Sequence, residues 1–293
     1  MHVRCMFFGL AECMETNVPR IPHSAYGCKL HIRTSVRMLK PFHFIFRFLL
    51  VWVFLFSTEA VLSQITFQKT FGNAHGNQAN SVELTNDGGY IVAGWYDMTA
   101  LFTSEFYLIK TDQFGDTIWA RTYGRKVDSN ARHNGGNLGY HAIQTSDNGY
   151  LMVGEVHGFG AGLADVYVVK VDSLGNLLWS KTYGTTEADY SEAVLETANG
   201  DFVIVGFTES GNVDVRDGYV LRIDLDGDLV WNKTFGGESI DALTKVIQSP
   251  DGGLFMVGYS FSFGASSSDV YAIKTTADGN IEWEKTYGGV ENE

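Results

Sequence analysis

Alternating carboxylates form the first spacing in this chain that could do chemistry. Asp224, Asp226 and Asp228 are separated by single residues, and such a pattern suits a hard cation such as Ca²⁺. A calcium loop of the EF-hand kind would continue with a glycine and close with a glutamate. Leu229 and Phe235 stand at those two places. We therefore interpret the stretch as a turn, with calcium as the alternative, and expect no bound metal or cofactor.

The histidines are the next candidates for chemistry. Those after residue 63 are His75, His133, His141 and His157. They are isolated from one another, and three of them lie in stretches rich in glycine or asparagine. Metal sites and catalytic triads need defined partners, so we interpret these histidines as solvated loop residues. The sequence also contains no G-x-S-x-G elbow, H-E-x-x-H pair or phosphate-binding G-x-x-x-x-G-K-S/T loop, and we expect no catalytic residues.

A tetrad of Lys, Thr, an aromatic residue and Gly recurs through the chain, with Arg once in place of Lys. The segments that contain it start at Phe67, Trp119, Trp179, Trp231 and Trp283, at spacings of 52, 60, 52 and 52 residues. Between these marks each unit repeats a turn, an apolar run and a glycine, as in NDGGYIVAG, SDNGYLMVG, ANGDFVIVG and PDGGLFMVG. A glycine also stands four residues before each of the four tryptophans that begin these segments. Self-similarity at a nearly fixed period indicates a repeat architecture.

Each unit predicts four short β-strands. In the third unit these are Ser191–Thr197, Phe202–Phe207, Gly218–Ile223 and Leu229–Thr234, which are rich in Val, Ile, Leu and aromatic residues. Asn-Gly or Asp-Gly type turns join the first two strands, and a four-residue turn ending in glycine, such as D-L-D-G, joins the last two. Such short links force neighbouring strands to be antiparallel. The predicted fold class is all-β: a β-propeller of four-stranded antiparallel blades, with four repeats present. The expected units are 72–123, 124–183, 184–235 and 236–287 within a propeller region of residues 64–293.

The strand count predicts an incomplete ring. Five copies of the tetrad-bearing strand are present, but only four sets of the other three strands. The opening copy, Ile65–Phe71, therefore needs partner strands from a later unit. The final residues GGVENE resemble GGESID, which begins an earlier unit. We expect a fifth unit to start here, at least one more blade to follow Glu293, and the four blades present to form an open arc.

The repeated aromatic residues and acids are expected to be structural. A buried tryptophan removes about 150–250 Å² from water, and on the outermost strand it can pack against the next blade. This interpretation applies to Trp119, Trp179, Trp231 and Trp283, and to the recurring tyrosines Tyr107, Tyr167, Tyr219 and Tyr271. The acids two residues before these tyrosines, Glu105, Asp165, Asp217 and Asp269, are expected to accept hydrogen bonds from neighbouring turns.

One basic insertion interrupts the repeats. Residues 125–139, RKVDSNARHNGGNLG, run eight residues longer than the corresponding stretches of the other units. The insertion brings together Arg125, Lys126, Arg132 and His133. Because loops often carry binding function, it is a candidate anion- or glycan-binding loop; the alternative is a tolerated surface insertion.

The combined motif, D-x-Y-x-I-K-x-D-x-x-G-x-x-x-W-x-K-T-Y-G after a DGGY-I-V-A-G stretch, resembles the β-propeller repeats of secreted bacterial proteins of the Bacteroidetes type. The resemblance covers residues 65–293 and implies architecture rather than activity. The element D-x-x-G-x-x-x-W, at Asp112–Trp119, Asp172–Trp179 and Asp224–Trp231, also resembles the tryptophan-docking motif of quinoprotein-like propellers. The fourth unit departs from that motif, because Thr276 takes the place of the aspartate.

Residues 38–63 have the pattern of a signal peptide. Lys40 and Arg47 precede the apolar run Phe48–Phe56, and small residues follow, with Ser63 before the expected cleavage site. A membrane anchor is the alternative, but this run has nine residues where a spanning helix needs about 20. We expect a secreted or cell-surface protein, or a periplasmic one, without a membrane span after cleavage.

Residues 1–37 are expected to be untranslated, with the start at Met38, or unstructured.

Charge narrows the possible partners. The chain has 34 acidic and 21 basic residues in 293, a formal net charge of −13. Phosphate binding needs clustered Lys and Arg, so we expect no nucleic-acid partner. The leading expectation is a non-catalytic exported propeller that binds a protein or carbohydrate or serves as a surface module. The alternative is an exported enzyme, quinoprotein-like or glycan-active, which would need unlike polar residues from different blades clustered at the centre.

Overall fold

The computed structural model describes residues 29–31, 67–72, 76–97, 104–124, 136–209, 215–264 and 268–289. The regular elements in these ranges are all β-strands, and no helix within them is long and apolar enough to cross a membrane. The expected signal peptide and the basic insertion from Arg125 to His133 lie outside the described residues.

Four antiparallel sheets of four strands each follow one another along the chain. The first holds β3 (Asn77–Leu84), β4 (Tyr90–Asp97), β5 (Ser104–Thr111) and β6 (Thr117–Tyr123). The second holds β7 (Asn137–Gln144), β8 (Tyr150–His157), β9 (Ala164–Val171) and β10 (Leu177–Tyr183). The third holds β11 (Asp189–Glu196), β12 (Phe202–Glu209), β13 (Arg216–Ile223) and β14 (Leu229–Phe235). The fourth holds β15 (Asp241–Gln248), β16 (Leu254–Ser260), β17 (Asp269–Thr275) and β18 (Ile281–Tyr287).

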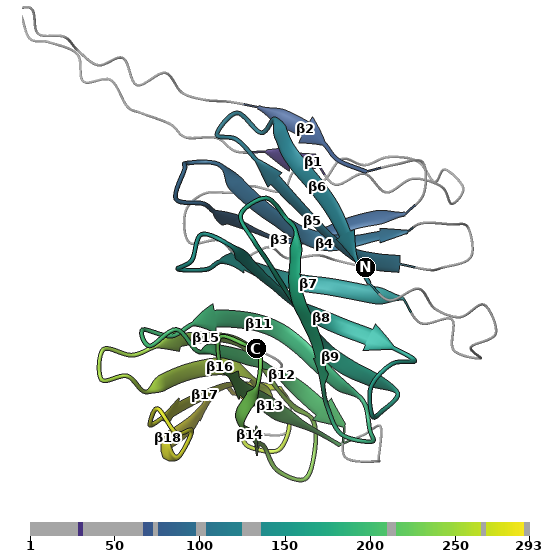
Figure 1. Cartoon of the computed structure of the whole chain (residues 1–293). Helices are drawn as coiled ribbons and strands as arrows, with labels where there is room; N and C mark the ends of the chain where they lie inside the picture. Colours follow the sequence, from purple (N-terminus) through teal and green to yellow (C-terminus); the bar gives the residue numbers. More distant parts are fainter. Residues whose placement is uncertain are drawn as a thin grey trace, which may run out of the picture.

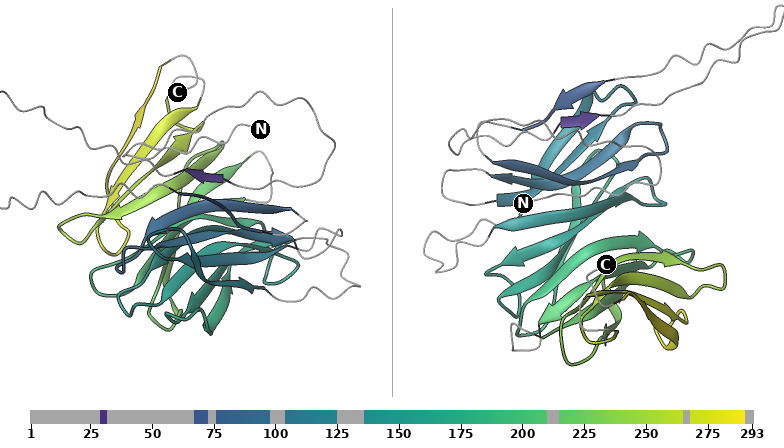
Figure 2. Two further views of the ribbon diagram at one scale, coloured as in Figure 1. Left: turned by 90° about the horizontal axis from the view of Figure 1, so that it is seen from above. Right: turned by 180° about the vertical axis from the view of Figure 1, so that it is seen from behind.

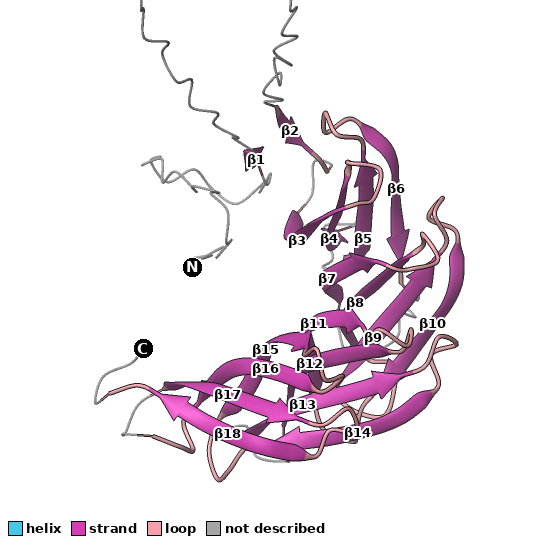
Figure 3. Cartoon of the chain, turned by 90° about the vertical axis from the view of Figure 1, so that its left-hand side faces the viewer, coloured by secondary structure: helices cyan, strands magenta, loops and turns pink. Residues whose placement is uncertain are grey.

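This architecture confirms the all-β fold of four-stranded antiparallel blades. In the third blade, the strand ends lie within two residues of those expected from the sequence. The sheets stack in chain order from the blue first blade to the yellow fourth (Figures 1 and 2). They form an arc and do not close into a ring (Figure 3). The first strand of each blade lies on the concave side of the arc and the fourth on the convex side, so β3, β7, β11 and β15 are the inner strands (Figure 3).

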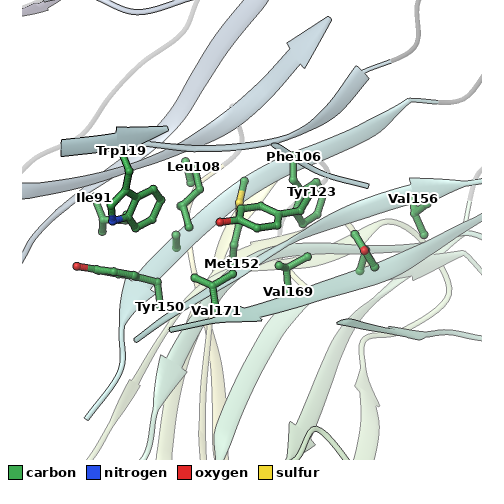
Figure 4. Close-up of a cluster of buried hydrophobic side chains, with 13 residues drawn as sticks. Ile91, Phe106, Leu108, Trp119, Tyr123, Tyr150, Met152, Val156, Val169 and Val171 are labelled. Carbon is green, nitrogen blue, oxygen red and sulfur yellow. The ribbon is translucent and has the colours of Figure 1, made fainter. Parts of the chain in front are cut away.

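The hydrophobic core lies between blades rather than within one. Three clusters of buried side chains fill the three junctions. In the first, Trp119 and Leu108 of the first blade face Tyr150 and Met152 of the second (Figure 4). The rings of Trp119 and Tyr150 meet edge to face at 5.6 Å, and the indole Nε1 donates a hydrogen bond to the Ser173 carbonyl at 3.2 Å. Each sheet therefore depends on its neighbour to bury its face.

A turn glycine makes room for each of these tryptophans. Gly175 has φ of +78°, and a β-carbon at that position would lie 3.0 Å from the Trp119 ring. The same contact recurs between Gly227 and Trp179 and between Gly279 and Trp231, each at 2.9 Å. The glycine thus serves both the left-handed turn and the packing of the preceding blade.

Phe67 occupies the corresponding position in front of the first blade. It precedes β2 (Gln68–Thr70), which pairs with β1 (Lys29–His31), and a β-carbon at Gly115 would lie 2.4 Å from the Phe67 ring. Lys69 pairs with Asp116 at 2.6 Å, as Lys181 pairs with Asp228 at 2.6 Å further along the chain. The opening copy of the tetrad strand therefore contacts the first blade in the way that each later copy contacts its successor.

At the other end of the described arc, Trp283 of β18 contacts no following blade among the described residues. The residue is 39% exposed, whereas Trp119 is 8% exposed. Its ring contacts Phe255 of its own sheet at 5.7 Å. The last described blade thus presents the side that the earlier blades bury.

A cation of the third strand, buried in the first two blades and partly buried in the others, binds the first hairpin turn of each blade. Lys110 pairs with Asp87 at 2.8 Å and Lys170 with Asp147 at 2.7 Å, and each lysine side chain is 4% exposed. Arg222 and Lys274 make the equivalent pairs with Asp201 and Asp251. Hydrogen bonds from Lys110 and Thr85 lower the pKa of Asp87 from 3.8 to about 2. The recurring basic residue of the third strand is therefore explained by this ion pair.

We expect the substitution Trp119→Ala to lower the free energy of unfolding by about 3–5 kcal/mol, the range for deleting a large buried aromatic side chain. Trp283→Ala is the matched control, because the same residue type there is partly exposed; its cost should stay below about 1 kcal/mol. Denaturant unfolding of both variants measures the difference. Equal losses would contradict inter-blade packing as the cause of the repeat.

Acid should weaken the ion pair of the first blade. Because the folded pKa of Asp87 is depressed, its contribution is present above pH 3.8 and is lost as the pH falls through about 2. The unfolding free energy of Asp87→Asn should therefore fall less steeply over that range than that of the wild type. Asp278→Asn, an exposed turn residue, should follow the wild-type curve. Parallel curves for Asp87→Asn and the wild type would disprove the assignment.

Candidate functional site

A β-bulge interrupts the pairing of each inner strand with the second strand of its blade. The register shifts at the same place in every first hairpin, so that Asn80, Tyr140, Glu192 and Thr244 are the extra residues. A glycine of the second strand lies opposite each bulge. At Gly154 a β-carbon would lie 2.0 Å from the Leu138 carbonyl oxygen, so no side chain fits there. The repeated glycine of the apolar run is therefore required by the bulge.

The residues that the bulges present differ from blade to blade, unlike the framework around them. The residue after the second-strand glycine also varies, as Trp95, Glu155, Phe207 and Tyr259. Side chains from these positions and their neighbours interact across the second and third blades. We call the following residues the axial cluster: Tyr140, Glu155, His157, Tyr190, Glu192, Phe207, Glu209 and Arg216. The residues that recur in every unit form the fold, whereas the residues of the axial cluster differ from unit to unit.

Glu155 is the centre of the second-blade part of the cluster. Its side chain is 6% exposed and lies 3.0 Å from Nε2 of His157. The hydrogen bond that His157 donates to Glu155 raises the pKa of His157, although partial burial lowers it. Tyr140 also hydrogen-bonds to Glu155, and burial followed by the nearby carboxylate raises the pKa of that tyrosine. Glu155 thus accepts from two different donors and holds both in place.

Glu192 brings a second carboxylate to the same region from the third blade. Burial, followed by repulsion from Glu155, raises the pKa of Glu192, while Lys245 of the fourth blade lowers it. Two carboxylates whose environments differ can act as a proton donor and a proton acceptor. Three blades therefore contribute charge to one region, through Glu155, Glu192 and Lys245.

An aromatic pair continues the cluster within the third blade. The rings of Tyr190 and Phe207 stack at 4.6 Å with an interplanar angle of 24°. Arg216 lies over the Phe207 ring at 5.0 Å and pairs with Glu209 at 3.0 Å. The result is an apolar surface beside fixed hydrogen-bonding groups, a combination typical of small-molecule sites.

A hollow of about 490 Å³ opens along the inner strands beside the cluster. Its lining includes Glu83, His141, Glu196 and Lys245, one from each blade. Nε2 of His141 lies 3.5 Å from Glu83, and its Nδ1 accepts a hydrogen bond from the Val194 N–H at 3.4 Å. This histidine therefore links three blades and is held by partners on both sides of its ring.

The structure contradicts the sequence-based interpretation of two histidines and agrees with the interpretation of the Asp224–Asp228 stretch as a turn. His141 and His157 lie in strands with carboxylate partners, so the expectation of solvated loop residues is wrong for these two. The stretch from Asp224 to Asp228 is a turn: Asp224 accepts hydrogen bonds from the N–H groups of Asp226 and Asp228 at 3.0 and 2.7 Å. No group of three or more metal-ligating side chains occurs among the described residues.

The repeated tyrosines stabilise blades and their junctions. Tyr167 packs against Phe106 of the preceding blade at 5.0 Å, and Tyr271 donates a hydrogen bond to Glu284 at 2.6 Å. Tyr219 accepts one from the Asn232 side chain at 3.3 Å. Tyr107 packs on Tyr96 of its own blade at 5.0 Å. None of these four belongs to the axial cluster.

Sequence reasoning missed the axial cluster because it searched for recurring residues. The signal lay in the positions at which the four units carry different residues. At the position after the second-strand glycine, three units carry an aromatic residue, Trp95, Phe207 or Tyr259, and the second unit carries Glu155. Aligning the units and removing their common pattern would have found it.

Comparison with known proteins gives limited matches. No family model matches the chain. A 157-residue segment is 26% identical to the regulatory protein FlaEY of Caulobacter vibrioides, covering 45% of this chain and 16% of that protein. The chain therefore spans less than a fifth of the length of this relative.

Among solved structures, a Bacteroides caccae protein of unknown function aligns over 75% of this chain and 85% of its own, with 11% identity and a TM-score of 0.33. A candidate exo-beta-1,3-galactanase from Bifidobacterium bifidum s17 aligns over 70% and 69%, with 13% identity and a TM-score of 0.39. The propeller-like fold assigned to this chain rests on its own four sheets.

The charge of Glu192 should cost stability, because its folded pKa is raised. Its protonated form is favoured by folding, so stability is lost as the pH rises from the ordinary value of 4.5 through the raised pKa. Glu192→Gln should therefore gain stability relative to the wild type as the pH rises over this range, with little difference below it. Urea unfolding at several pH values measures the effect, with the exposed turn variant Asp226→Asn as control. A constant difference at all pH values would disprove it.

Proposed function

We propose that the chain is an exported, non-catalytic binding module that holds a carbohydrate on the concave face of the arc. The observation that carries the proposal is the stacked pair of Tyr190 and Phe207 beside the carboxylates of Glu155 and Glu192. Sugars offer apolar C–H faces and hydroxyl groups. Aromatic rings complement the former, and fixed polar side chains complement the latter.

The polar part of the cluster supports this ligand class. Carboxylates accept hydrogen bonds from hydroxyl groups, and Arg216 and Tyr140 are donors. Their mutual contacts fix their positions before a ligand arrives, which lowers the cost of ordering them on binding. The acidic balance of the chain disfavours an anionic ligand such as a nucleic acid.

The asymmetry of the site also supports a specific ligand. A repeat scaffold with like residues at its axis would present a symmetric surface. Here Tyr140, Glu192 and Thr244 stand at equivalent bulges and offer different chemistry. An oligosaccharide has a direction and unlike substituents, so an asymmetric surface suits it. Export, expected from residues 38–63, would bring the chain to such ligands.

A glycan-active enzyme is the second candidate, favoured by the raised pKa of Glu192 next to Glu155. A pair of carboxylates with different protonation is the usual apparatus of glycoside hydrolysis. Under this alternative, Glu192 would donate the proton and Glu155 would act as base or nucleophile.

A glycan array with the full chain, followed by calorimetry on the best glycan, tests the proposal. Tyr190→Ala should weaken binding at least about tenfold, equivalent to 1.4 kcal/mol. Phe114→Ala, which removes an exposed aromatic residue from the β5–β6 turn, should leave binding unchanged. A glycan affinity of Tyr190→Ala equal to that of the wild type would refute the assignment of the site.

Product analysis of the same glycan separates the two candidates. Unaltered glycan after long incubation favours a binding module. Cleavage that Glu192→Gln abolishes, with glycan binding retained, would instead establish the enzyme.

A further inference from the structure

A hydrogen bond from main chain to side chain links the inner strands at two of the three blade junctions. At the first junction the Ser81 hydroxyl accepts from the Ala142 N–H at 3.3 Å. At the second, Nδ1 of His141 accepts from the Val194 N–H at 3.4 Å. In both cases the residue after the bulge of one inner strand accepts from the next inner strand. The repeat therefore places an acceptor at this position.

The third junction has no such acceptor. Ala193 takes the place of His141 in the third blade, and Val246 takes the place of Val194 in the fourth. The equivalent register directs the Val246 N–H toward Ala193, whose methyl group cannot accept a hydrogen bond. Both residues are buried and line the hollow beside the axial cluster. A buried N–H without an acceptor is costly, so this one calls for an oxygen from elsewhere.

A positive charge lies beside this N–H. Lys245 precedes Val246 on β15 and lines the same hollow. None of the ion pairs between described residues includes Lys245. Because Ala193 is small, space opens between His141 and Lys245, its counterparts on the two neighbouring inner strands. An ammonium group next to a main-chain N–H is a favourable environment for a carboxylate.

Two carboxylates line the hollow on the inner strands of earlier blades. Glu196 ends β11, and Glu83 lies on β3. Glu196 accepts from the Ser146 N–H at 2.7 Å and from its hydroxyl at 2.5 Å, and Glu83 lies 3.5 Å from Nε2 of His141. A carboxylate has about four acceptor sites, so each can accept from a further donor. The hollow thus has its donors on one inner strand and its carboxylates on two others.

The wall between these charged groups is apolar. Ile143, Val194 and Leu195 contribute to it. The volume of the hollow is about 490 Å³, within the range of about 300–1,000 Å³ that is usual for small-molecule sites. A ligand with a carboxylate, an ammonium group and an apolar side chain would match the three parts of this lining.

We propose that the hollow binds a free amino acid with an apolar side chain. The ligand carboxylate accepts from the Val246 N–H and from Lys245, and so supplies the acceptor that Ala193 lacks. The ligand ammonium group donates to the carboxylates of Glu196 and Glu83, and its side chain lies on the apolar wall. The hollow shares no lining residue with the axial cluster, so this site is separate from the proposed carbohydrate site.

The chain itself suggests the most informative variant. Ala193→Ser places a hydroxyl group where Ser81 has one at the first junction. This hydroxyl would accept from the Val246 N–H and occupy the position of the ligand carboxylate. We therefore expect Ala193→Ser to lose ligand binding without a decrease in the free energy of unfolding.

The test is calorimetry on the full chain with leucine as the probe. Two analogues each lack one charge: 4-methylpentanoate has no ammonium group, and isopentylamine has no carboxylate. We expect leucine to bind the wild type and each analogue to bind at least about tenfold more weakly. Ala193→Ser and Lys245→Gln should each weaken leucine binding at least about tenfold. Lys285→Gln, which removes an exposed charge on β18, should bind leucine like the wild type.

Three outcomes would overturn the proposal: no binding of leucine or of any other apolar amino acid to the wild type, an unchanged affinity in Ala193→Ser, or 4-methylpentanoate binding as tightly as leucine. The analogues need only the wild type, so the proposal stays falsifiable if a variant fails to fold. Tyr190→Ala should bind leucine like the wild type, so this site and the carbohydrate site can fail separately.

Discussion

The contact on which this structure depends is an aromatic ring of one blade lying over a turn glycine of the next. A β-sheet that is hydrophobic on one face must bury that face against another element. Trp119 over Gly175 supplies that cover, and the two following junctions repeat it. The contact needs a left-handed turn and an absent side chain at the same residue, so Gly115, Gly175, Gly227 and Gly279 all have φ between +72° and +78°.

Stability and recognition are separated within each blade. The outer half carries the tryptophan and the turn glycine, and an ion pair ties the third strand to the turn between the first two strands; all recur in the four described blades, with Arg222 in place of Lys in the third. The inner strand carries the bulge, whose geometry is fixed by the glycine opposite while its side chain is free, as Tyr140 and Glu192 show. Unlike groups therefore occupy the bulges of the inner strands while the tryptophan–glycine contacts recur at the junctions.

Much of this could be predicted from the sequence, because recurring residues report recurring environments. Period, turn residues and alternation located the strands of the third blade to within two residues. Two features could not be obtained that way. The axial cluster consists of residues that do not recur, and the hydrogen bond from the Val194 N–H to His141 joins strands of different blades. The partner of His157 was missed for a simpler reason: Glu155 lies two residues earlier in the same strand, and a loop had been assumed there.

The equivalence of the junctions has an evolutionary consequence. Gly175, Gly227 and Gly279 each receive the tryptophan of the preceding unit, so any unit fits against any other without a new interface. Unequal recombination within the gene could add or remove a whole blade, and the tryptophan–glycine contact at the new seam would already be in place. Lineages could then change blade number in single steps while point substitutions altered the concave face, so the size of the arc and the chemistry of its inner surface can diverge independently.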